Sequence, residues 1–263
     1  MCTAVEGCMS SGDAPRVVAI IPARYGSERF PGKVIAPLAG KPLVVHTYER
    51  TRSAKCLSEV LVATDDDRIV EALKPYNVRT VMTRNDHPTG TDRIAEVAAK
   101  LDADIIVNVQ ADEPLVDPAL IDAVVKPLLD DPGVPMSTAR HAIRETALIH
   151  DPNCVKVVCD AQGHALYFSR SPIPFVRATG HDPRRENIYW QHIGLYVFRR
   201  EFLLRFAQMK PTVNERLEKL EQLRVLENGY VIAVVEAGAR TIGVDTPEDL
   251  ARAEEALAEA KKA

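Results

Sequence analysis

Short apolar runs and longer amphipathic stretches alternate along the first half of the chain. Four runs rich in β-branched residues predict strands at 17–21, 59–64, 78–83 and 104–109. Apolar residues at helical spacing between these runs predict helices at 41–54, 66–76 and 92–101. The strand at 17–21 is apolar throughout and the strand at 104–109 is largely apolar, which is typical of strands covered on both faces. The pattern therefore predicts a doubly wound α/β domain whose ligands bind at the carboxyl ends of parallel strands.

The second half of the chain has a different rhythm. Apolar runs predict strands at 155–160, 165–168, 193–199 and 230–237, and helical spacing predicts helices at 200–209, 216–229 and from Pro247 onward. Residues 169–191 form a long connection rich in Pro, Arg and His, and long connections are usually functional or interfacial. We interpret the chain as an α/β core interrupted by a smaller β-rich insertion. The predicted parts are a flexible extension (1–16), the core (17–152), the insertion (153–215) and a return to the core (216–263).

Composition narrows the class of protein. The 263 residues carry 33 Lys and Arg against 37 Asp and Glu, a formal charge of -4, which argues against general affinity for nucleic acid or membranes. Five scattered cysteines without a C-x-x-C pair fit reduced thiols in a cytoplasmic protein. Residues 1–16 lack the pattern of a signal peptide, and no apolar run approaches the length of about 20 residues that spans a bilayer.

The loop after the first predicted strand, "IIPARYGSERFPGK", is locally basic. Arg24, Arg29 and Lys33 stand near two glycines, and Glu28 alone opposes them. Cations and exposed backbone N–H groups favour a polyanion, although charges on an ordinary solvated loop are a plausible alternative. The position after strand one, with Lys41 further along, favours a diphosphate or triphosphate. Arg29 is the weaker candidate, consistent with a charge that only stabilises the loop.

Two carboxylates follow other predicted strands. Asp112, in "NVQADEPLV", comes directly after strand 104–109, where a carboxylate suits Mg²⁺ bridging substrate phosphates; a turn before Pro114 is the alternative. Asp245, in "GVDTPEDL", is left over once Thr246 is taken as the N-cap of the last helix. Asp117 is better explained as the N-cap of the helix that follows it.

Four further stretches place polar groups beside apolar anchors: "TGTDR" (89–93), "YFSRSPIP" (167–174), "QHIGLY" (191–196) and "LEQLR" (220–224). None has metal-site spacing or the pattern of a nucleophile with its base. Taken alone, His192 is typical of a histidine satisfied within the fold, and Arg170 and Glu221 are typical of structural ion pairs.

Together these motifs, in order, make the chain resemble the 3-deoxy-manno-octulosonate cytidylyltransferases from about Val17 to the final helix. The stretches "ALYFSRSPIP" and "LEQLRVLENG" are the most specific to that family, whereas the basic loop is shared more widely. The resemblance implies a nucleotide-diphospho-sugar transferase fold with a smaller subdomain for homodimerisation. It implies that CTP and the acid sugar Kdo react in the presence of Mg²⁺ to give CMP-Kdo and diphosphate, for lipopolysaccharide biosynthesis.

The resemblance also assigns residues. It implies that Arg24, Lys33, Asp112 and Asp245 are catalytic, the first two gripping phosphates and the two aspartates holding the metal. It implies CTP binding by Ala23, Arg24, Lys33, Arg93 and Gln110. It implies Kdo binding by Gln110, Arg170, His192, Tyr196, Glu221 and Gln222. Arg170 is the candidate partner for the sugar carboxylate, because a guanidinium binds a carboxylate in bidentate fashion.

The sequence departs from the family pattern at a few positions. Ala111 replaces the usual Gly, so a Cβ enters a place where close approach of the backbone to the ligand is expected. Thr89 and Asp92 stand where Ser and Glu are common. These changes bear on sugar specificity more than on the reaction. The alternatives are a cytidylyltransferase for another acid sugar, such as sialic acid or an 8-amino Kdo analogue, and a non-catalytic nucleotide-binding protein.

Overall fold

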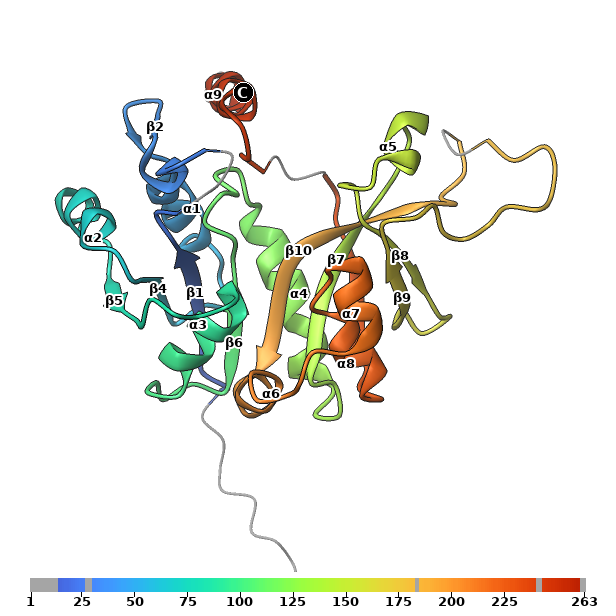
Figure 1. Cartoon of the computed structure of the whole chain (residues 1–263), viewed down its shortest axis with the longest axis horizontal. Coiled ribbons are helices and arrows are strands. Elements are labelled where there is room, and N and C mark those ends of the chain that lie inside the picture. Colours follow the sequence, from blue (N-terminus) through green and yellow to red (C-terminus); the bar gives the residue numbers. More distant parts are fainter. Residues whose placement is uncertain (1–13, 27–29, 183–184, 240–242, 261–263) are drawn as a thin grey trace, which may run out of the picture.

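The computed structural model describes residues 14–26, 30–182, 185–239 and 243–260. Within them, nine strands form one sheet with the order β11-β7-β10-β6-β1-β4-β5, and β8 and β9 extend it beside β10 (Figure 1). The strands are β1 (Val17–Ala23), β4 (Glu59–Thr64), β5 (Thr80–Met82), β6 (Ile105–Asn108), β7 (Met136–Ala142), β8 (Lys156–Cys159), β9 (Ala165–Ser169), β10 (Trp190–Arg199) and β11 (Ile232–Glu236). A separate two-stranded sheet joins β2 (Pro37–Leu38) and β3 (Lys41–Pro42).

The sheet is mostly parallel. β1 pairs in parallel with β4 and β6, β4 with β5, and β11 with β7. β10 runs antiparallel to both β6 and β7, and so joins the two parallel halves. The carboxyl ends of β1 and β6 therefore lie at the same edge, as the sequence predicts for a ligand-binding edge.

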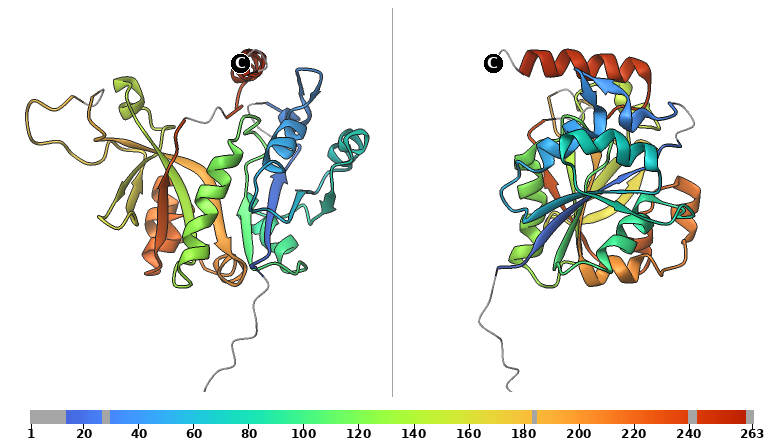
Figure 2. Two further views of the ribbon diagram at one scale, coloured as in Figure 1. Left: turned by 180° about the vertical axis from the view of Figure 1, so that it is seen from behind. Right: turned by 90° about the vertical axis from the view of Figure 1, so that its left-hand side faces the viewer.

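Helices cover both faces of the sheet (Figure 2). They are α1 (Leu43–Thr51), α2 (Asp67–Leu73), α3 (Gly90–Ala98), α4 (Pro118–Asp130), α5 (Thr146–His150), α6 (Arg200–Phe206), α7 (Val213–Glu218), α8 (Leu223–Glu227) and α9 (Pro247–Ala260), with short 3-10 helices at Lys33–Ile35 and Lys74–Tyr76. In β1, Ala19 and Ile21 pack with α1 and α4, whereas Val18 and Ile20 pack with α3 and α6. The apolar strand is thus buried on both sides, which confirms the predicted α/β class.

Local sequence signals place several helix starts correctly. The Asp117 carboxylate accepts a hydrogen bond from the N–H of Ala119, so Asp117 is the N-cap of α4 as predicted. Thr246 and Asp249 exchange hydrogen bonds at the start of α9, at 3.2 and 2.9 Å, in the manner of a capping box. α9 then packs across β2 and α1 through Ala253.

The single helix predicted at 216–229 is wrong. The chain turns at Lys219, which has a left-handed φ of 52°, and the segment divides into α7 and α8. The Glu215 carboxylate bridges the turn and receives two N–H donors from the Arg224 guanidinium. β7 and α5 were not predicted either, because the apolar residues in these segments are few and form only short runs.

The predicted insertion contains β8 and β9, which form an antiparallel pair that contacts the sheet at β10. In Figure 1 this pair and the long connection before β10 project from one side of the sheet. The boundaries of the insertion and its part in dimerisation remain predictions. Of the predicted extension, residues 1–13 lie outside the described part. Among the described helices, none is both long and apolar enough to cross a membrane.

Candidate active site

The basic loop follows β1 and is closed on itself by backbone contacts. The N–H of Gly32 donates to the carbonyl of Tyr25 at 2.9 Å. Gly32 has a φ of 70°, and a Cβ there would lie 3.2 Å from the Tyr25 ring, so both the conformation and the close approach require glycine. The Arg68 guanidinium covers the Tyr25 ring at 3.4 Å. Arg24 directly precedes Tyr25 and Lys33 directly follows Gly32, so the two cations stand at the two ends of the closed loop.

Lys33 joins three segments that are far apart in the sequence. Its Nζ lies 2.5 Å from Oδ2 of Asp112 and 2.9 Å from Oδ1 of Asp245, and it donates to the carbonyl of Val244 at 3.0 Å. The Lys33 side chain is 12% exposed, against 29% for Asp112 and 50% for Asp245. The structure therefore brings the predicted phosphate-binding lysine and both predicted metal carboxylates to one point.

Asp245 reaches this point because the chain returns to the carboxyl edge of the sheet after β11. The N–H of Val244 donates to the carbonyl of Asp112 at 2.9 Å, which fixes the returning segment beside the end of β6. Asp249, in the first turn of α9, accepts from the N–H of Asp245 at 3.0 Å. These bonds set the backbone on both sides of the Asp245 carboxylate.

The two carboxylates create a position for a cation. Burial acts to lower the pKa of Lys33, but the neighbouring Asp112 and Asp245 outweigh it, and the pKa is raised above its ordinary value. The described residues contain no group of three or more His, Cys, Asp or Glu side chains arranged as a metal centre. Two carboxylates beside a predicted phosphate-binding loop nevertheless fit Mg²⁺, which takes few protein carboxylates and completes its shell with phosphates and water.

A cavity of about 570 Å³ opens beside these groups. Its lining residues are Pro22, Arg24, Lys33, Val34, His87, Pro88, Thr89, Gly90, Arg93, Gln110, Ala111, Asp112 and Asp245. It brings together most of the predicted phosphate, metal and CTP residues. Lys41 is not among them; it pairs with Glu49 at the surface. Arg29 lies outside the described residues.

Arg93 and Ala111 line the cavity and are also held by hydrogen bonds and ion pairs within the protein. The Arg93 guanidinium is buried, pairs with Asp65 at 3.0 Å and donates to the Thr83 hydroxyl. The carbonyl of Ala111 accepts from the hydroxyl of Thr47 at 3.0 Å. Ala23, also predicted to contact CTP, is the buried last residue of β1 and is not a lining residue.

Most of the residues assigned to Kdo form a second group that does not line this cavity. The rings of His192 and Tyr196 lie 5.4 Å apart, and the Tyr196 hydroxyl donates to Oε1 of Gln222 at 3.3 Å. Glu221, next along the chain, accepts a hydrogen bond from Thr91. Gln110 connects the two groups, since it lines the cavity and donates to Asn108, the residue opposite Tyr196 in the sheet.

Burial determines the electrostatics of this second group. It lowers the pKa of His192 to about 3, so the imidazole is neutral at neutral pH, and it raises the pKa of Tyr196 and of the Glu221 carboxyl. Nε2 of Gln222 is buried without a hydrogen-bond partner among the described residues. A buried donor without a partner costs free energy, which a ligand acceptor would recover.

Arg170 does not join this group through its guanidinium. Nε donates to the carbonyl of Glu218 at 2.7 Å, and one Nη donates to the carbonyl of Pro152 at 2.8 Å. The backbone N–H of Arg170 also donates to the Glu218 carboxylate, at 3.0 Å. The side chain thus ties the end of β9 to the turn after α7, and its contact with a sugar carboxylate remains a prediction.

Several cavity residues were missed by reasoning from the sequence. His87 is the clearest: its Nε2 lies 2.6 Å from Oε2 of Glu96, which also accepts from the N–H of Arg84. The hydrogen bond from His87 is the main reason that the pKa of Glu96 falls to about 2. A histidine two residues before the helix N-cap Thr89 was an available signal. Pro22 and Pro88 offered none, because they contribute shape alone.

The fold and the cavity together are those of a nucleotidyltransferase, with two cations and two carboxylates where parallel strands end. The sequence profile of the cytidylyltransferase family matches residues 18–241. A 3-deoxy-manno-octulosonate cytidylyltransferase from Geobacter sulfurreducens is 54% identical over 247 residues, which cover 92% of this chain and 99% of that protein. A protein of the same name from Geotalea daltonii is 56% identical over 248 residues, covering 92% and 98%. The chain belongs to the 3-deoxy-manno-octulosonate cytidylyltransferase family.

Solved structures superpose on this chain as well. A CMP:2-keto-3-deoxy-manno-octonic acid synthetase complexed with CTP superposes with a TM-score of 0.87 at 41% identity, covering 93% of this chain and 99% of that one. A 4-diphosphocytidyl-2C-methyl-D-erythritol synthase from Anaerococcus prevotii, at 15% identity with a TM-score of 0.60, shares the fold; it covers 93% of this chain and 97% of that one.

Proposed function

We propose that this protein couples CTP to 3-deoxy-manno-octulosonate, giving CMP-Kdo and diphosphate. The observation that carries the proposal is the meeting of Lys33, Asp112 and Asp245 at the mouth of a cavity, in a chain of this family. The anomeric hydroxyl of the sugar attacks the α-phosphorus of CTP. A new P–O bond forms to the sugar, the bond from the α-phosphorus to the diphosphate breaks, and the hydroxyl proton is released to water.

The chain's own cations act on the leaving group. Arg24 lines the cavity, and Lys33 needs only to turn from the two carboxylates toward the phosphates to neutralise charge on the diphosphate. Phosphoryl transfer depends on positioning and on charge neutralisation, which fixed cations supply without covalent chemistry. Gln110 and Arg93, at the cavity wall, orient the nucleotide.

Asp112 and Asp245 are the residues that would hold Mg²⁺. When bound, the ion polarises phosphate oxygens and neutralises charge that develops on them. In this structure the Lys33 ammonium contacts both carboxylates and balances their negative charge.

The acid sugar binds against the second group. Gln222 offers an unpaired amide N–H donor, and the Tyr196 hydroxyl oxygen and the Glu221 carboxylate supply acceptors nearby. Hydroxyl-rich ligands need both kinds of partner, whereas the neutral His192 adds no charge.

Release of diphosphate is the direct test. The purified protein is incubated with CTP and Kdo, first with magnesium omitted and then with it restored. We expect release only with CTP, Kdo and Mg²⁺ together. A panel of acid sugars, including sialic acid and 8-amino Kdo, is run in parallel. Faster turnover of one of these would change the assigned substrate, and no release with any sugar would overturn the proposal.

We also propose a homodimer in the cytoplasm that supplies CMP-Kdo for lipopolysaccharide. Large apolar side chains are exposed within residues 153–215: Leu166 is 61% exposed, Phe175 88% and Val213 59%. Exposed apolar side chains of this size favour burial against another chain. Sedimentation equilibrium should give twice the mass of the chain, and the mass of one chain at micromolar concentration would overturn the dimer.

A further inference from the structure

We propose that Thr91 is a positioning residue for the sugar-binding side of the site, acting through Glu221. The inference rests on the proposed function, because it assumes that Glu221 contacts the sugar. Nothing in the sequence motifs assigns Thr91 a part beyond the helix that it helps to begin.

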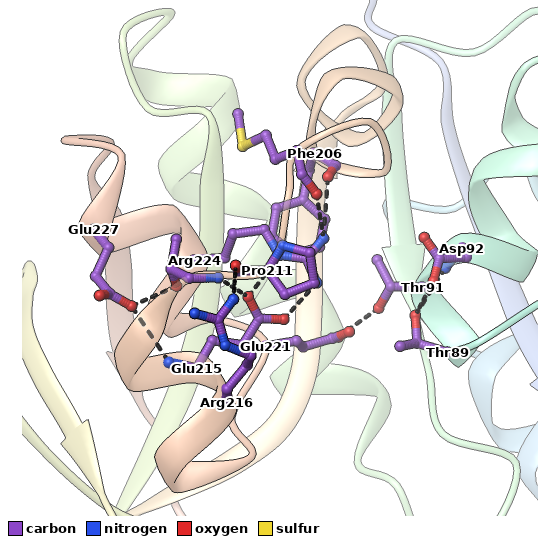
Figure 3. A network of polar contacts seen from close by, with 12 residues as sticks. Thr89, Thr91, Asp92, Phe206, Pro211, Glu215, Arg216, Glu221, Arg224 and Glu227 are labelled. Carbon is purple, nitrogen blue, oxygen red and sulfur yellow. Dashed lines mark hydrogen bonds and ion pairs between the residues drawn. The ribbon is translucent and has the colours of Figure 1, made fainter.

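The contact itself joins distant parts of the chain. The Thr91 hydroxyl donates to Oε1 of Glu221, across 130 positions in sequence (Figure 3). Thr91 is 2% exposed, so water does not compete for this hydrogen bond. Figure 3 shows the Glu221 side chain extending from its own segment toward Thr91 in the neighbouring helix.

Thr91 lies in the first turn of α3, beside the cavity. Its neighbour Gly90 and, two positions on, Arg93 both line the cavity. Thr89 fixes the turn as the N-cap of α3, accepting from the N–H of Asp92 at 3.1 Å. The same turn therefore presents one side to the CTP pocket and, through the Thr91 hydroxyl, the other to Glu221.

The backbone of Glu221 is held by other contacts. Arg224 pairs with Glu215 across the turn between α7 and α8, and it also donates to the carbonyl of Met209 at 3.2 Å (Figure 3). The neighbouring Gln222 accepts from Tyr196. Removing the Thr91 hydroxyl should therefore release the Glu221 side chain while the turn that carries it stays in place.

The hydroxyl also favours the charged form of Glu221. Burial raises the pKa of this carboxyl, and the hydrogen bond from Thr91 opposes that rise. Valine has nearly the shape of threonine but no donor. Without the donor, the carboxylate loses its fixed orientation, and its pKa rises further.

The experiment compares Thr91→Val with Thr91→Ser, which keeps the hydroxyl, and with Thr51→Val as a matched control. Thr51 is equally buried in a helix, but its hydroxyl donates to the carbonyl of Thr47 at 2.7 Å. We expect Thr91→Val to raise KM for Kdo about tenfold, as for a lost hydrogen bond to a charged group, while the Kd for CTP changes less than about twofold. Thr91→Ser should restore KM, and Thr51→Val should leave it unchanged.

Two more readouts separate positioning from a structural role. The pH profile of kcat/KM in Thr91→Val should show an apparent pKa moved upward. In a Glu221→Gln background, Thr91→Val should add little, because the two changes act through one contact. Equal effects of Thr91→Val and Thr51→Val, a parallel loss of CTP affinity, or full additivity with Glu221→Gln would overturn the inference. An inactive parent protein would instead overturn the proposed function.

Discussion

The site has two regions that differ in charge and in burial. At the charged edge, Lys33, Asp112 and Asp245 meet at the mouth of a cavity, partly in contact with water. In the second group, His192, Tyr196 and Gln222 are buried, and burial keeps His192 neutral. The charges of the first region suit a highly charged ligand, and the hydrogen-bonding groups of the second suit a hydroxylated ligand.

The two regions should respond differently to substitution. A charged group at the open edge can exchange one partner for another, as we propose for Lys33, which would turn from the carboxylates to the phosphates. A buried polar group without its partner has no water to replace it and costs about 1–3 kcal/mol. Changes at the edge should therefore act mainly on catalysis and CTP binding, and changes in the second group on sugar binding and stability.

Asp112→Asn should give the largest effect. Replacing the carboxylate by an amide removes one of the two negative charges that fit Mg²⁺, so kcat should fall about 100-fold or more. The measurement is diphosphate release at saturating Mg²⁺, with the thermal midpoint as a check on folding. Asp117→Asn is the control, since Asp117 caps α4 and Asn is also a good cap. Near-parental turnover in Asp112→Asn would remove the metal assignment.

Lys33→Met tests the cation of the same region. The variant keeps an unbranched side chain but loses the charge, so KM for CTP should rise about tenfold or more. Steady-state kinetics with varied CTP measures the change. Lys41→Met is the matched control, because Lys41 contacts Glu49 at the surface and should leave KM unaltered. Unchanged kinetics in Lys33→Met would make the basic loop an ordinary solvated loop.

Tyr196→Phe tests the second region. It removes the hydroxyl that donates to Gln222 and leaves that buried amide with fewer partners. KM for Kdo should rise about fivefold and the free energy of unfolding should fall by about 1 kcal/mol, while the Kd for CTP stays constant. Kinetics, urea denaturation and calorimetric titration with CTP give the three values. Weaker CTP binding would show that the two regions are not separable.

His192 should make stability depend on pH. Its folded pKa of about 3 lies below the ordinary value of 6.5, so the unfolded chain binds a proton that the folded protein does not. Stability from this group is full above about pH 6.5 and falls as pH drops toward 3, by about 1.4 kcal/mol per unit. Urea denaturation between pH 7.5 and 4.5 measures this slope.

His192→Gln should reduce that slope, whereas His150→Gln, at an exposed position, should preserve it. Identical slopes in all three proteins would mean that His192 is not held neutral by burial.

The sequence predictions are accurate where a signal depends only on residues that are close together in the chain. The loop after β1 and the caps at Asp117 and Thr246 were predicted because they depend on a few adjacent residues. The division between α7 and α8 was missed, because apolar spacing continues through a turn that Glu215 and Arg224 stabilise from its two sides. The group around Tyr196 came from resemblance to a family, since His192 or Glu221 alone indicates no site.

By itself, the sequence determined the α/β class, the carboxyl edge of β1 and β6 as the binding edge, and the cations and carboxylates available there. Periodicity and turn chemistry act over a few residues, so they can be recognised without the fold. Only the tertiary structure decided that Asp245 meets Lys33 and that Thr91 meets Glu221. These pairs lie 212 and 130 positions apart, and their contacts exist because sheet pairing and helix packing bring the segments together.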